Sequence, residues 1–354
     1  MALCRRSPVA SYFLGLTSGA ALSLLAFNFF SSELMYFAKP NDVYYGSRAL
    51  LTSHGRVEHV REENEELMRE VSSRVRVLCW IMTSHKNTYK KAIHVNATWA
   101  PRCNKHIFFS ADPKSGLPTV NLNVTEGRRH LWAKTKRAFK YLYEHELHNF
   151  DWFYKADDDT YALVENLRFM LMGHSPDAPL SFGCKFKPFV KSGYMSGGAG
   201  YVLSRESLRR FVEEALPNKT KCKGSDSAFA EDVEMGKCLR NVGVEPADSR
   251  DYQGRHRMLP LAPTVHMNAN GTLPKWLMSY MFYPYRKGSQ CCSNYVVSFH
   301  YINTGFMYTL DYFIYKLSLF GSHHEHFQKY GAVNSTIFER ATAFARSYSQ
   351  VGNS

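Results

Sequence analysis

Three consecutive aspartates, Asp157, Asp158 and Asp159, are the densest group of chemically capable side chains in the sequence. Adjacent carboxylates repel one another, which costs stability unless a cation neutralises them. Hard oxygen ligands of this kind suit Mg²⁺ or Mn²⁺, which keep coordination positions open for water and phosphate groups. A plainer alternative is that one aspartate caps the following helix and the others are solvated. Because the triplet directly follows a predicted strand, where side chains project into a crevice, we favour the metal site.

A glycine-rich run at 192–203 (SGYMSGGAGYVL) is a second candidate segment. Gly197, Gly198 and Gly200 permit close backbone approach to a ligand, just before a predicted strand and a helix opened by Ser204. The run is neither a Gly-x-Gly-x-x-Gly fingerprint nor a P-loop, since no lysine follows a glycine at the required place. It is therefore a candidate wall of a binding site without a motif of its own.

A pair of acids, Glu231 and Asp232, begins a predicted helix in the run 230–235 (AEDVEM). Acidic residues are favourable near a helix N-terminus, so the pair has a purely structural interpretation. A carboxylate held opposite a metal could instead serve as a general base. Both interpretations stay open on these residues alone.

The elements that must position these groups alternate between strand and helix. The predicted strands are 75–83, 105–110 and 150–156, and the predicted helices are 89–99, 131–147 and 163–172. The first strand (VRVLCWIMT) is too apolar for a half-exposed strand and too short for most helices, as expected of a central parallel strand. The alternation predicts an α/β fold with a doubly wound, mainly parallel sheet, in which ligands bind beyond the carboxyl ends of the strands.

The composition is that of a folded chain rather than a disordered tail. It has 354 residues, of which 45% are hydrophobic and 21% charged, enough to bury a full core. Lysine and arginine total 44 against 31 acidic residues, giving a net charge of +13. This charge permits attraction to phosphate-bearing or acidic partners. The basic residues are scattered instead of clustering with aromatics on one face, which argues against a nucleic-acid-binding protein.

An apolar segment at 9–30 predicts a membrane anchor. No charged residue lies between Arg6 and Glu33, and at about 1.5 Å per residue the segment is long enough to cross a ~30 Å hydrocarbon layer. The apolar stretch of a cleaved signal peptide is shorter, although the small residues at 19–21 keep cleavage open. Arg5 and Arg6 precede the segment, so the positive-inside rule predicts a type II protein whose bulk is lumenal.

These features predict five regions along the chain. They are a cytosolic tail (1–8), a transmembrane signal anchor (9–30), a lumenal stem (31–73), a catalytic domain (74–320) and a C-terminal extension (321–354). The stem contains a charged stretch at 61–70 (REENEELMRE), read as a polar helix that either separates the catalytic domain from the membrane or dimerises weakly. The extension carries no recognisable motif.

Cysteines and glycosylation sequons agree with a lumenal location. Cys4 falls in the predicted cytosolic tail, which leaves seven of the eight cysteines in an oxidising compartment. The residues assigned to disulfides are Cys79 with Cys103, Cys222 with Cys238, and the adjacent Cys291 and Cys292, which either form a vicinal ring or seek other partners. Cys184 is the predicted free thiol. The possible glycan acceptors are Asn96, Asn123, Asn218, Asn270 and Asn334.

Short motifs between about residue 75 and about residue 315 together resemble one known family. The motifs are KADDDTY, GYMSGGAGYVLS, EDV, SFHY, RVLCWIMT, TWAPRCNK, FKPF and QCCS. Their combination is similar to the core 1 β1,3-galactosyltransferase family among animal β1,3-glycosyltransferases. The resemblance implies a GT-A fold, with a nucleotide-sugar-binding α/β sheet, in a single-pass type II protein of the Golgi membrane.

The resemblance also assigns roles to the acids. Asp157 and Asp159 match the ends of the family's D-x-D motif and His300 matches its late histidine, so these three are the expected Mn²⁺ ligands. Asp158 would lie near the ribose or the sugar. Asp232 matches the catalytic base. Without the resemblance, a lone histidine after a strand is usually just hydrogen-bonded.

Further residues are assigned to the two substrates by the same resemblance. The residues expected to contact the donor UDP-galactose are Met82, Thr83, Arg102, Asp157, Asp158, Gly197 and Gly198. Trp276 and Tyr283 are the expected contacts of the acceptor sugar. Their segment, WLMSYMFYP, departs from the usual pattern of the family, and aromatic clusters are more often part of a core.

The implied reaction is the inverting transfer of galactose from UDP-galactose to the 3-hydroxyl of N-acetylgalactosamine (GalNAc) linked to Ser or Thr. Two alternatives remain: a related β1,3-glycosyltransferase that uses another UDP-sugar, and an inactive lumenal binding or chaperone-like relative. The inactive relative would be expected to lack the acidic cluster present here. The implied partners are GalNAc-bearing glycoproteins, a second copy of the chain in a homodimer, and a dedicated chaperone of the endoplasmic reticulum.

Overall fold

The computed structural model describes residues 57–110, 116–228, 230–268, 270–271, 273–317, 334–340 and 342–343. These residues belong to one compact unit, Arg56–Ser354. The predicted tail, the predicted anchor, the first part of the stem and most of the C-terminal extension lie outside the described ranges. Among the helices that the described ranges contain, none combines the length and the apolar character that a membrane span requires.

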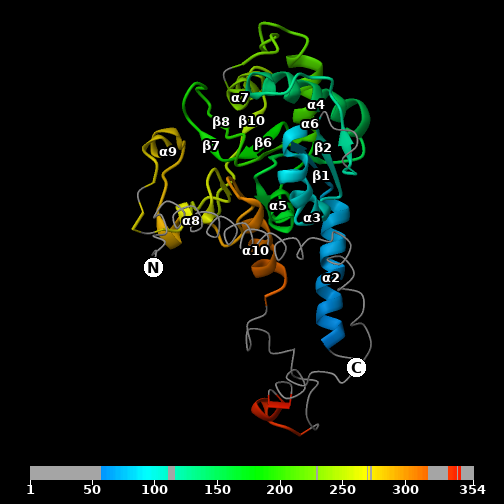
Figure 1. Cartoon of the computed structure of the whole chain (residues 1–354), viewed down its shortest axis with the longest axis vertical. Coiled ribbons are helices and arrows are strands. Elements are labelled where there is room, and N and C mark those ends of the chain that lie inside the picture. The colour runs from blue at the N-terminus through cyan, green and yellow to red at the C-terminus, as the bar shows by residue number, and fades with distance from the viewer. Residues whose placement is uncertain are drawn as a thin grey trace, which may run out of the picture. The chain divides into compact units, whose positions relative to one another are not determined.

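A seven-stranded sheet forms the centre of this unit (Figure 1). Its strands, in spatial order, are β10 (Glu245–Pro246), β6 (Leu180–Gly183), β9 (Tyr201–Ser204), β4 (Trp152–Asp157), β1 (Val77–Met82), β2 (Lys105–Phe109) and β3 (Thr119–Val120). β1 pairs in parallel with β2 and β4, and β3 continues the parallel order, whereas β9 runs antiparallel to β4 and β6. The mixed, mostly parallel sheet agrees with the predicted α/β class.

Helices pack on both faces of the sheet: α3 (Ile93–Ala97) and α5 (Val164–Leu171) contribute to the core on one face, and α4 (Leu131–Glu146), α6 (Arg205–Arg210) and α7 (Glu231–Arg240) to the core on the other. The described ranges also contain α2 (Val57–Arg74), α8 (Pro263–His266), α9 (Lys275–Tyr280) and α10 (Thr304–Tyr315). The stem stretch 61–70 lies within α2. Ser204 caps α6 by accepting a hydrogen bond from the backbone N–H of Ser207, as is typical of serine at an N-cap.

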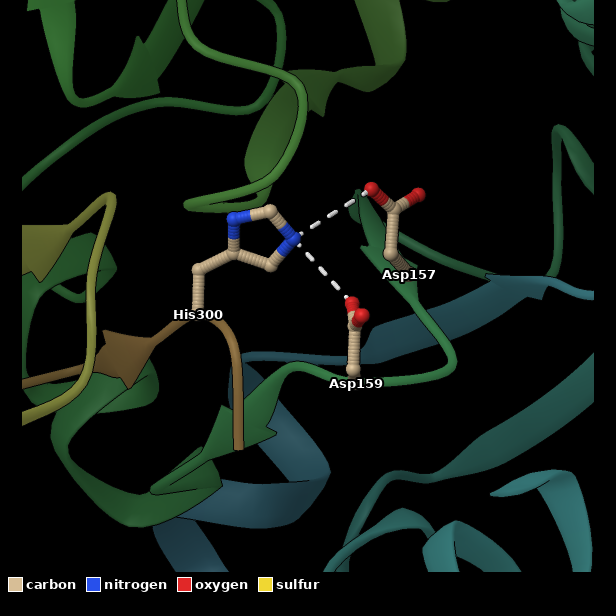
Figure 2. A group of neighbouring side chains, drawn as sticks. All are labelled: Asp157, Asp159 and His300. Atoms are coloured by element: carbon tan, nitrogen blue, oxygen red, sulfur yellow. Dashed lines mark ion pairs between the residues drawn. The ribbon is translucent and has the colours of Figure 1, made fainter. Parts of the chain in front are cut away.

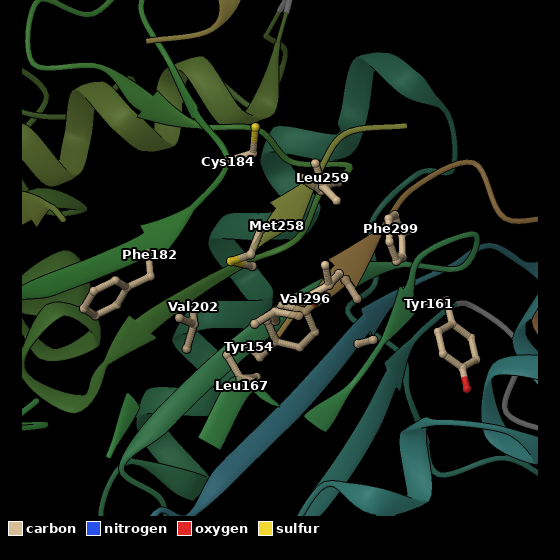
Figure 3. Packing of buried hydrophobic residues seen from close by; sticks show 14 of the residues in the cluster. Tyr154, Tyr161, Leu167, Phe182, Cys184, Val202, Met258, Leu259, Val296 and Phe299 are labelled. Carbon is tan, nitrogen blue, oxygen red and sulfur yellow. The ribbon is translucent and has the colours of Figure 1, made fainter. Parts of the chain in front are cut away.

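Alternation along β1 divides the core into two hydrophobic clusters, one on each face. Val77, Cys79 and Ile81 enter one cluster, and Leu78, Trp80 and Met82 enter the other. On the second face, α4 buries Trp132, Ala138, Phe139 and Leu142, which recur at helical spacing, and Phe139 packs edge-on against Trp80 with ring centroids 4.9 Å apart. Figure 3 shows part of the first cluster, where Phe182, Val202 and Tyr154 pack together.

Two small sheets adjoin the central one. The first contains β11 (Met258–Leu259), β12 (Ser298–Phe299) and β5 (Tyr161–Ala162), and the second contains β7 (Lys185–Phe186) and β8 (Tyr194–Met195). β12 pairs antiparallel with β5, which follows the Asp triplet within a few residues. This pairing brings a late segment of the chain to the carboxyl edge of the central sheet.

The cysteines form three disulfides in the structure, between Cys79 and Cys103, Cys222 and Cys238, and Cys291 and Cys292. The third is the vicinal alternative. Cys184 is a buried free thiol, and burial raises its pKa far above the ordinary value of a cysteine.

The sequons differ in accessibility. The side chains of Asn123, Asn218, Asn270 and Asn334 are exposed. Asn96 is half-buried in α3, and its Oδ1 lies 2.8 Å from Nε2 of His106, within hydrogen-bonding distance. The exposed asparagines are therefore the better placed of the five for modification.

Candidate active site

The Asp triplet lies at the carboxyl edge of the central sheet. Asp157 is the last residue of β4, and its register partner is Met82, the last residue of β1. Both border a cavity of about 650 Å³. The lining includes the sequence-predicted residues Met82, Thr83, Asp157, Asp158, Asp159, Gly197, Gly198, Asp232, Trp276 and His300. The structure thus brings together ten of the twelve residues assigned to catalysis, metal and substrates.

His300 follows β12 directly and points at the first and third aspartates (Figure 2). Its Nε2 lies 3.1 Å from Oδ1 of Asp159 and 3.8 Å from Oδ2 of Asp157. Backbone hydrogen bonds hold the loop in place, because the N–H of Ile302 donates to the carbonyl of Asp159 at 2.9 Å. One ligand atom from each of the three side chains lies within 4.8 Å of the others. Two carboxylates and an imidazole are a donor set that fits Mn²⁺.

The glycine run lies against His300. A Cβ added at Gly198 would lie 2.1 Å from Cε1 of His300, so only glycine fits beside the ring. The carbonyl of Gly198 accepts a hydrogen bond from Oγ1 of Thr160 at 3.0 Å, which fixes the backbone at this contact. The sequence predicted close approach of this backbone to a substrate, and the close approach that the structure contains is to His300.

Two lysines pair with Asp157 and Asp159, each through the carboxylate oxygen that is not the one nearest His300; these two oxygens are called the outer oxygens, and the other two the inner oxygens. Nζ of Lys155 lies 2.5 Å from Oδ1 of Asp157, and Nζ of Lys91 lies 2.9 Å from Oδ2 of Asp159. The remaining oxygen of each carboxylate is then the one that faces His300. Burial raises the pKa of Asp159, but hydrogen bonds and charges from His300 and Lys91 outweigh it and hold this pKa well below the ordinary range.

The middle aspartate has different surroundings. Oδ2 of Asp158 accepts hydrogen bonds from Oγ1 of Thr83 at 2.8 Å and from Nδ2 of Asn87 at 2.9 Å. Burial raises the pKa of Asp158 despite the nearby Lys91. Asp158 therefore ties the end of β1 to the end of β4 and is not part of the Asp-Asp-His group.

Asp232 lies in the first turn of α7, across the cavity from that group. Its Oδ2 accepts the backbone N–H of Gly197 at 3.0 Å and its Oδ1 accepts the N–H of Val233 at 2.9 Å. Burial raises the pKa of Asp232, and these two hydrogen bonds oppose the rise. A carboxylate with a raised pKa, held by backbone groups and facing a cavity, is suited to accept a proton.

Its neighbour Glu231 is engaged by other side chains. Oε1 of Glu231 accepts hydrogen bonds from Oγ1 of Thr135 at 3.0 Å and from the hydroxyl of Tyr201 at 2.8 Å. Burial raises the pKa of Glu231 as well. Of the two acids in the EDV triplet, Asp232 is the one held only by backbone donors.

Arg102 is placed away from the cavity, which corrects the expectation that it contacts the diphosphate. It ends the short helical turn Ala100–Arg102, just before β2, whereas the cavity adjoins the opposite, carboxyl ends of the strands. Its Nη2 donates to Oδ1 of Asp311 at 3.2 Å, and the guanidinium lies 3.5 Å from the ring centroid of Tyr315. Arg102 therefore joins α10 to the sheet.

The two predicted acceptor residues are separated. Trp276 of α9 lines the cavity with a side chain that is 43% exposed. Tyr283 does not line it, and the guanidinium of Arg250 lies 3.7 Å from its ring centroid. The acceptor role of Tyr283 therefore stays a prediction from the family resemblance, whereas Trp276 is placed at the cavity.

The cavity also contains residues to which sequence reasoning gave no role, among them Asn87, Lys155 and Tyr301. Lys155 had a readable signal: it precedes Asp157 by two residues in a strand, and residues i and i+2 share a face. Tyr301 has a positive φ of 56°, and its ring lies 3.9 Å from that of His300. Tyr301 belongs to the SFHY motif, in which only the histidine was given a role, and no sequence pattern marked Asn87.

Comparison with known proteins identifies relatives of this chain. Residues 75–282 match the Fringe-like family. A glycoprotein-N-acetylgalactosamine 3-beta-galactosyltransferase 1 from Xenopus laevis is 46% identical over 265 residues, which cover 74% of this chain and 72% of that protein. Chondroitin sulfate synthase 3 from Homo sapiens is 31% identical over 46% of this chain and 20% of its own length. A beta-1,3-glucosyltransferase from Mus musculus is 28% identical over 42% and 30%, respectively. The chain therefore belongs to the Fringe-like family, within its core 1 β1,3-galactosyltransferase group.

Proposed function

We propose that this chain transfers galactose from UDP-galactose to the 3-hydroxyl of GalNAc linked to Ser or Thr, with inversion at the anomeric carbon. The observation that carries the proposal is that one cavity is lined both by the Asp157, Asp159 and His300 group and by a separately held carboxylate, Asp232. The printed activity of the Xenopus laevis relative supports the choice of donor and acceptor.

Mn²⁺ is the proposed cofactor, held by Asp157, Asp159 and His300. When bound, the ion supplies Lewis-acid stabilisation of the negative charge that develops on the departing diphosphate. Lys155 and Lys91 keep the outer carboxylate oxygens occupied, so the inner oxygens stay directed at one point. This arrangement reduces the reorganisation that binding a cation would otherwise require.

Asp232 is the proposed base. It accepts the proton of the 3-hydroxyl as that oxygen forms its bond to the anomeric carbon, while the bond from this carbon to the UDP oxygen breaks on the opposite face. Direct displacement converts the α-linked donor into a β-linked product with a single carboxylate, unlike glycoside hydrolysis, which uses two. The backbone N–H groups of Gly197 and Val233 hold the carboxylate in place for this step.

The substrates are proposed to lie along the cavity wall. Met82, Thr83 and Asp158, together with the backbone at Gly197 and Gly198, would contact the nucleotide and the donor sugar. The exposed indole of Trp276 offers a flat apolar surface to the acceptor sugar. The contacts that Thr83 and Asn87 make to Asp158 keep this wall ordered.

We retain the Golgi location, the single membrane span at 9–30, the stem and the 74–320 catalytic domain as parts of the proposal. They rest on the uncharged apolar segment and the sequons of the sequence. A homodimer and a dedicated chaperone remain the proposed protein partners, by resemblance to the family.

The direct test is an assay of the full chain with UDP-galactose and a GalNAc-Ser/Thr peptide. We expect a β1,3-linked galactose on the peptide, loss of transfer in EDTA and recovery with Mn²⁺. The same assay with a panel of other UDP-sugars distinguishes the proposed galactosyltransferase from a related transferase, because the related transferase would transfer another sugar faster than galactose. An inactive relative would release no UDP in the presence of metal and acceptor.

A further inference from the structure

A buried lysine lies between the two halves of the active site. The side chain of Lys155 is 3% exposed, in the interior of β4. Its Nζ donates to Oδ1 of Asp157 at 2.5 Å and to the carbonyl of Gly197 at 3.1 Å. A buried ammonium is costly unless it is paired and hydrogen-bonded, so both contacts are needed to accommodate the charge at this position.

Gly197 connects this lysine to the proposed base. Its carbonyl accepts from Lys155, and its N–H donates to Oδ2 of Asp232 at 3.0 Å. Glycine has more backbone freedom than any other residue, so two hydrogen bonds at its two polar groups restrict it strongly. The chain of contacts therefore runs without a gap from Asp157 through Lys155 and Gly197 to Asp232.

The charge of Lys155 faces three carboxylates, those of Asp157, Glu231 and Asp232. Burial raises the pKa of Asp232 and the charge of Asp157 raises it further, whereas the charge of Lys155 lowers it. Lys155 thus favours the ionised carboxylate of Asp232 in two ways. It holds the backbone of Gly197, whose N–H donates to that carboxylate, and its positive charge lowers the pKa of Asp232.

We propose that Lys155 is a positioning residue that couples the metal-ligand carboxylate Asp157 to the base Asp232 through the backbone of Gly197. The inference rests on the proposed function and extends it. Lys155 contacts neither substrate in this account. Its role is to fix the position of the carboxylate of Asp232 relative to that of Asp157.

Lys91 provides a matched comparison. It too pairs with the triplet, at 3.4 Å from Oδ1 of Asp158 and 2.9 Å from Oδ2 of Asp159. No hydrogen bond among the described residues joins it to Gly197 or to Asp232. A lysine that only neutralises the acidic cluster should behave like Lys91, whereas a lysine that also positions the base should not.

The experiment uses the full chain and the substitution Lys155→Met, which replaces the unbranched stem of the lysine and removes its ammonium group and its charge. Loss of an interaction that orients a metal ligand typically costs about 10- to 100-fold in metal affinity or activity. We expect Mn²⁺ affinity, measured by calorimetry, to fall within that range. We also expect kcat at saturating Mn²⁺, UDP-galactose and acceptor to fall at least about 10-fold, and the acid limb of the kcat profile to move to higher pH.

A double-mutant cycle distinguishes an effect of Lys155 that acts through the base Asp232 from an effect on kcat that is independent of Asp232. In the Asp232→Asn background, Lys155→Met should change the residual kcat by less than about threefold, because residues that act as a unit are non-additive. Lys91→Met should lower Mn²⁺ affinity without moving the acid limb. The proposal is overturned by an equal loss of kcat in both backgrounds, by an unchanged kcat and acid limb in Lys155→Met, or by the same limb shift in Lys91→Met.

Folding is checked by thermal unfolding of each variant. If Lys155→Met does not fold, Lys155→Met/Glu231→Gln removes one charge of each sign and is compared with Glu231→Gln alone, with the same expected losses. A wild-type chain that transfers no galactose would count against the proposed function. A wild-type chain that transfers galactose, beside a Lys155 variant with normal kcat, would count against this inference alone.

Discussion

Gly198 lies so close to His300 that a Cβ on the glycine would be 2.1 Å from Cε1 of the imidazole. The contact explains why the glycine run adjoins the Asp triplet: it leaves room for a ring that must reach two carboxylates from a distant part of the sequence. The same contact offers a way to disturb the proposed metal site without changing any of its proposed ligands.

Gly198→Ala should displace the His300 ring and lower Mn²⁺ affinity by about 10- to 100-fold, the range seen when the orientation of a metal ligand is lost. Calorimetric titration of the full chain with Mn²⁺ measures this effect. Gly173→Ala is the matched control, because a Cβ at Gly173 would meet no atom within 4 Å. Equal affinities for the two variants would show that the ring tolerates the displacement.

Asp232→Asn should lower kcat for galactose transfer by about 10²- to 10⁴-fold, the usual contribution of a general base. Binding of UDP in the presence of Mn²⁺ should change little, because Asp232 lies outside the Asp-Asp-His group. Steady-state kinetics and calorimetry on the same preparation measure the two effects. Near-normal turnover would remove Asp232 from the reaction.

The pH dependence of transfer follows from the raised pKa of Asp232. Burial makes the folded protein hold this proton more tightly than an ordinary aspartate, whose pKa is about 3.9. Only the ionised carboxylate accepts a proton, so kcat should be full above the raised pKa and fall as the pH drops through it. A kcat profile measured at saturating substrates should therefore show an acid limb above pH ~4, and this limb should be missing from the residual activity of Asp232→Asn.

Arg102→Met tests the corrected position of this arginine. Loss of the contacts to Asp311 and Tyr315 should lower the free energy of unfolding by about 1 to 2 kcal/mol, the scale of a hydrogen bond to a charged group combined with a cation–π contact. The KM for UDP-galactose should not change, because Arg102 does not line the cavity. A large rise in KM with unchanged stability would restore the role expected from the family resemblance.

Much of the fold was predictable because its signals are local. β1 is a continuous apolar run, β4 is an apolar run interrupted by Lys155, and α4 shows a 3.6-residue period. The position of Asp157 at the end of β4 follows from the strand pattern. These elements place the acids at the correct edge of the sheet. The assignment of metal ligands and base needed the family resemblance as well.

The remaining features depend on contacts between distant segments. β5 and β12, which bring His300 to Asp159, are only two residues long, too short for any periodicity to reveal. Arg102 was misplaced because its motif was read without regard to strand direction, and it lies just before β2 instead of after its end. An aromatic run such as the one around Trp276 and Tyr283 does not show which rings face a cavity, so the sequence could not tell that only Trp276 lines it.

The most direct test of the account measures UDP binding and galactose transfer by the full chain and its Asp159→Asn variant, with and without Mn²⁺. The account predicts that Mn²⁺ strengthens UDP binding and supports transfer in the wild-type chain, and that Asp159→Asn loses both effects while its thermal unfolding stays cooperative. Transfer that proceeds equally well in EDTA, or an Asp159→Asn variant with wild-type turnover, would contradict it.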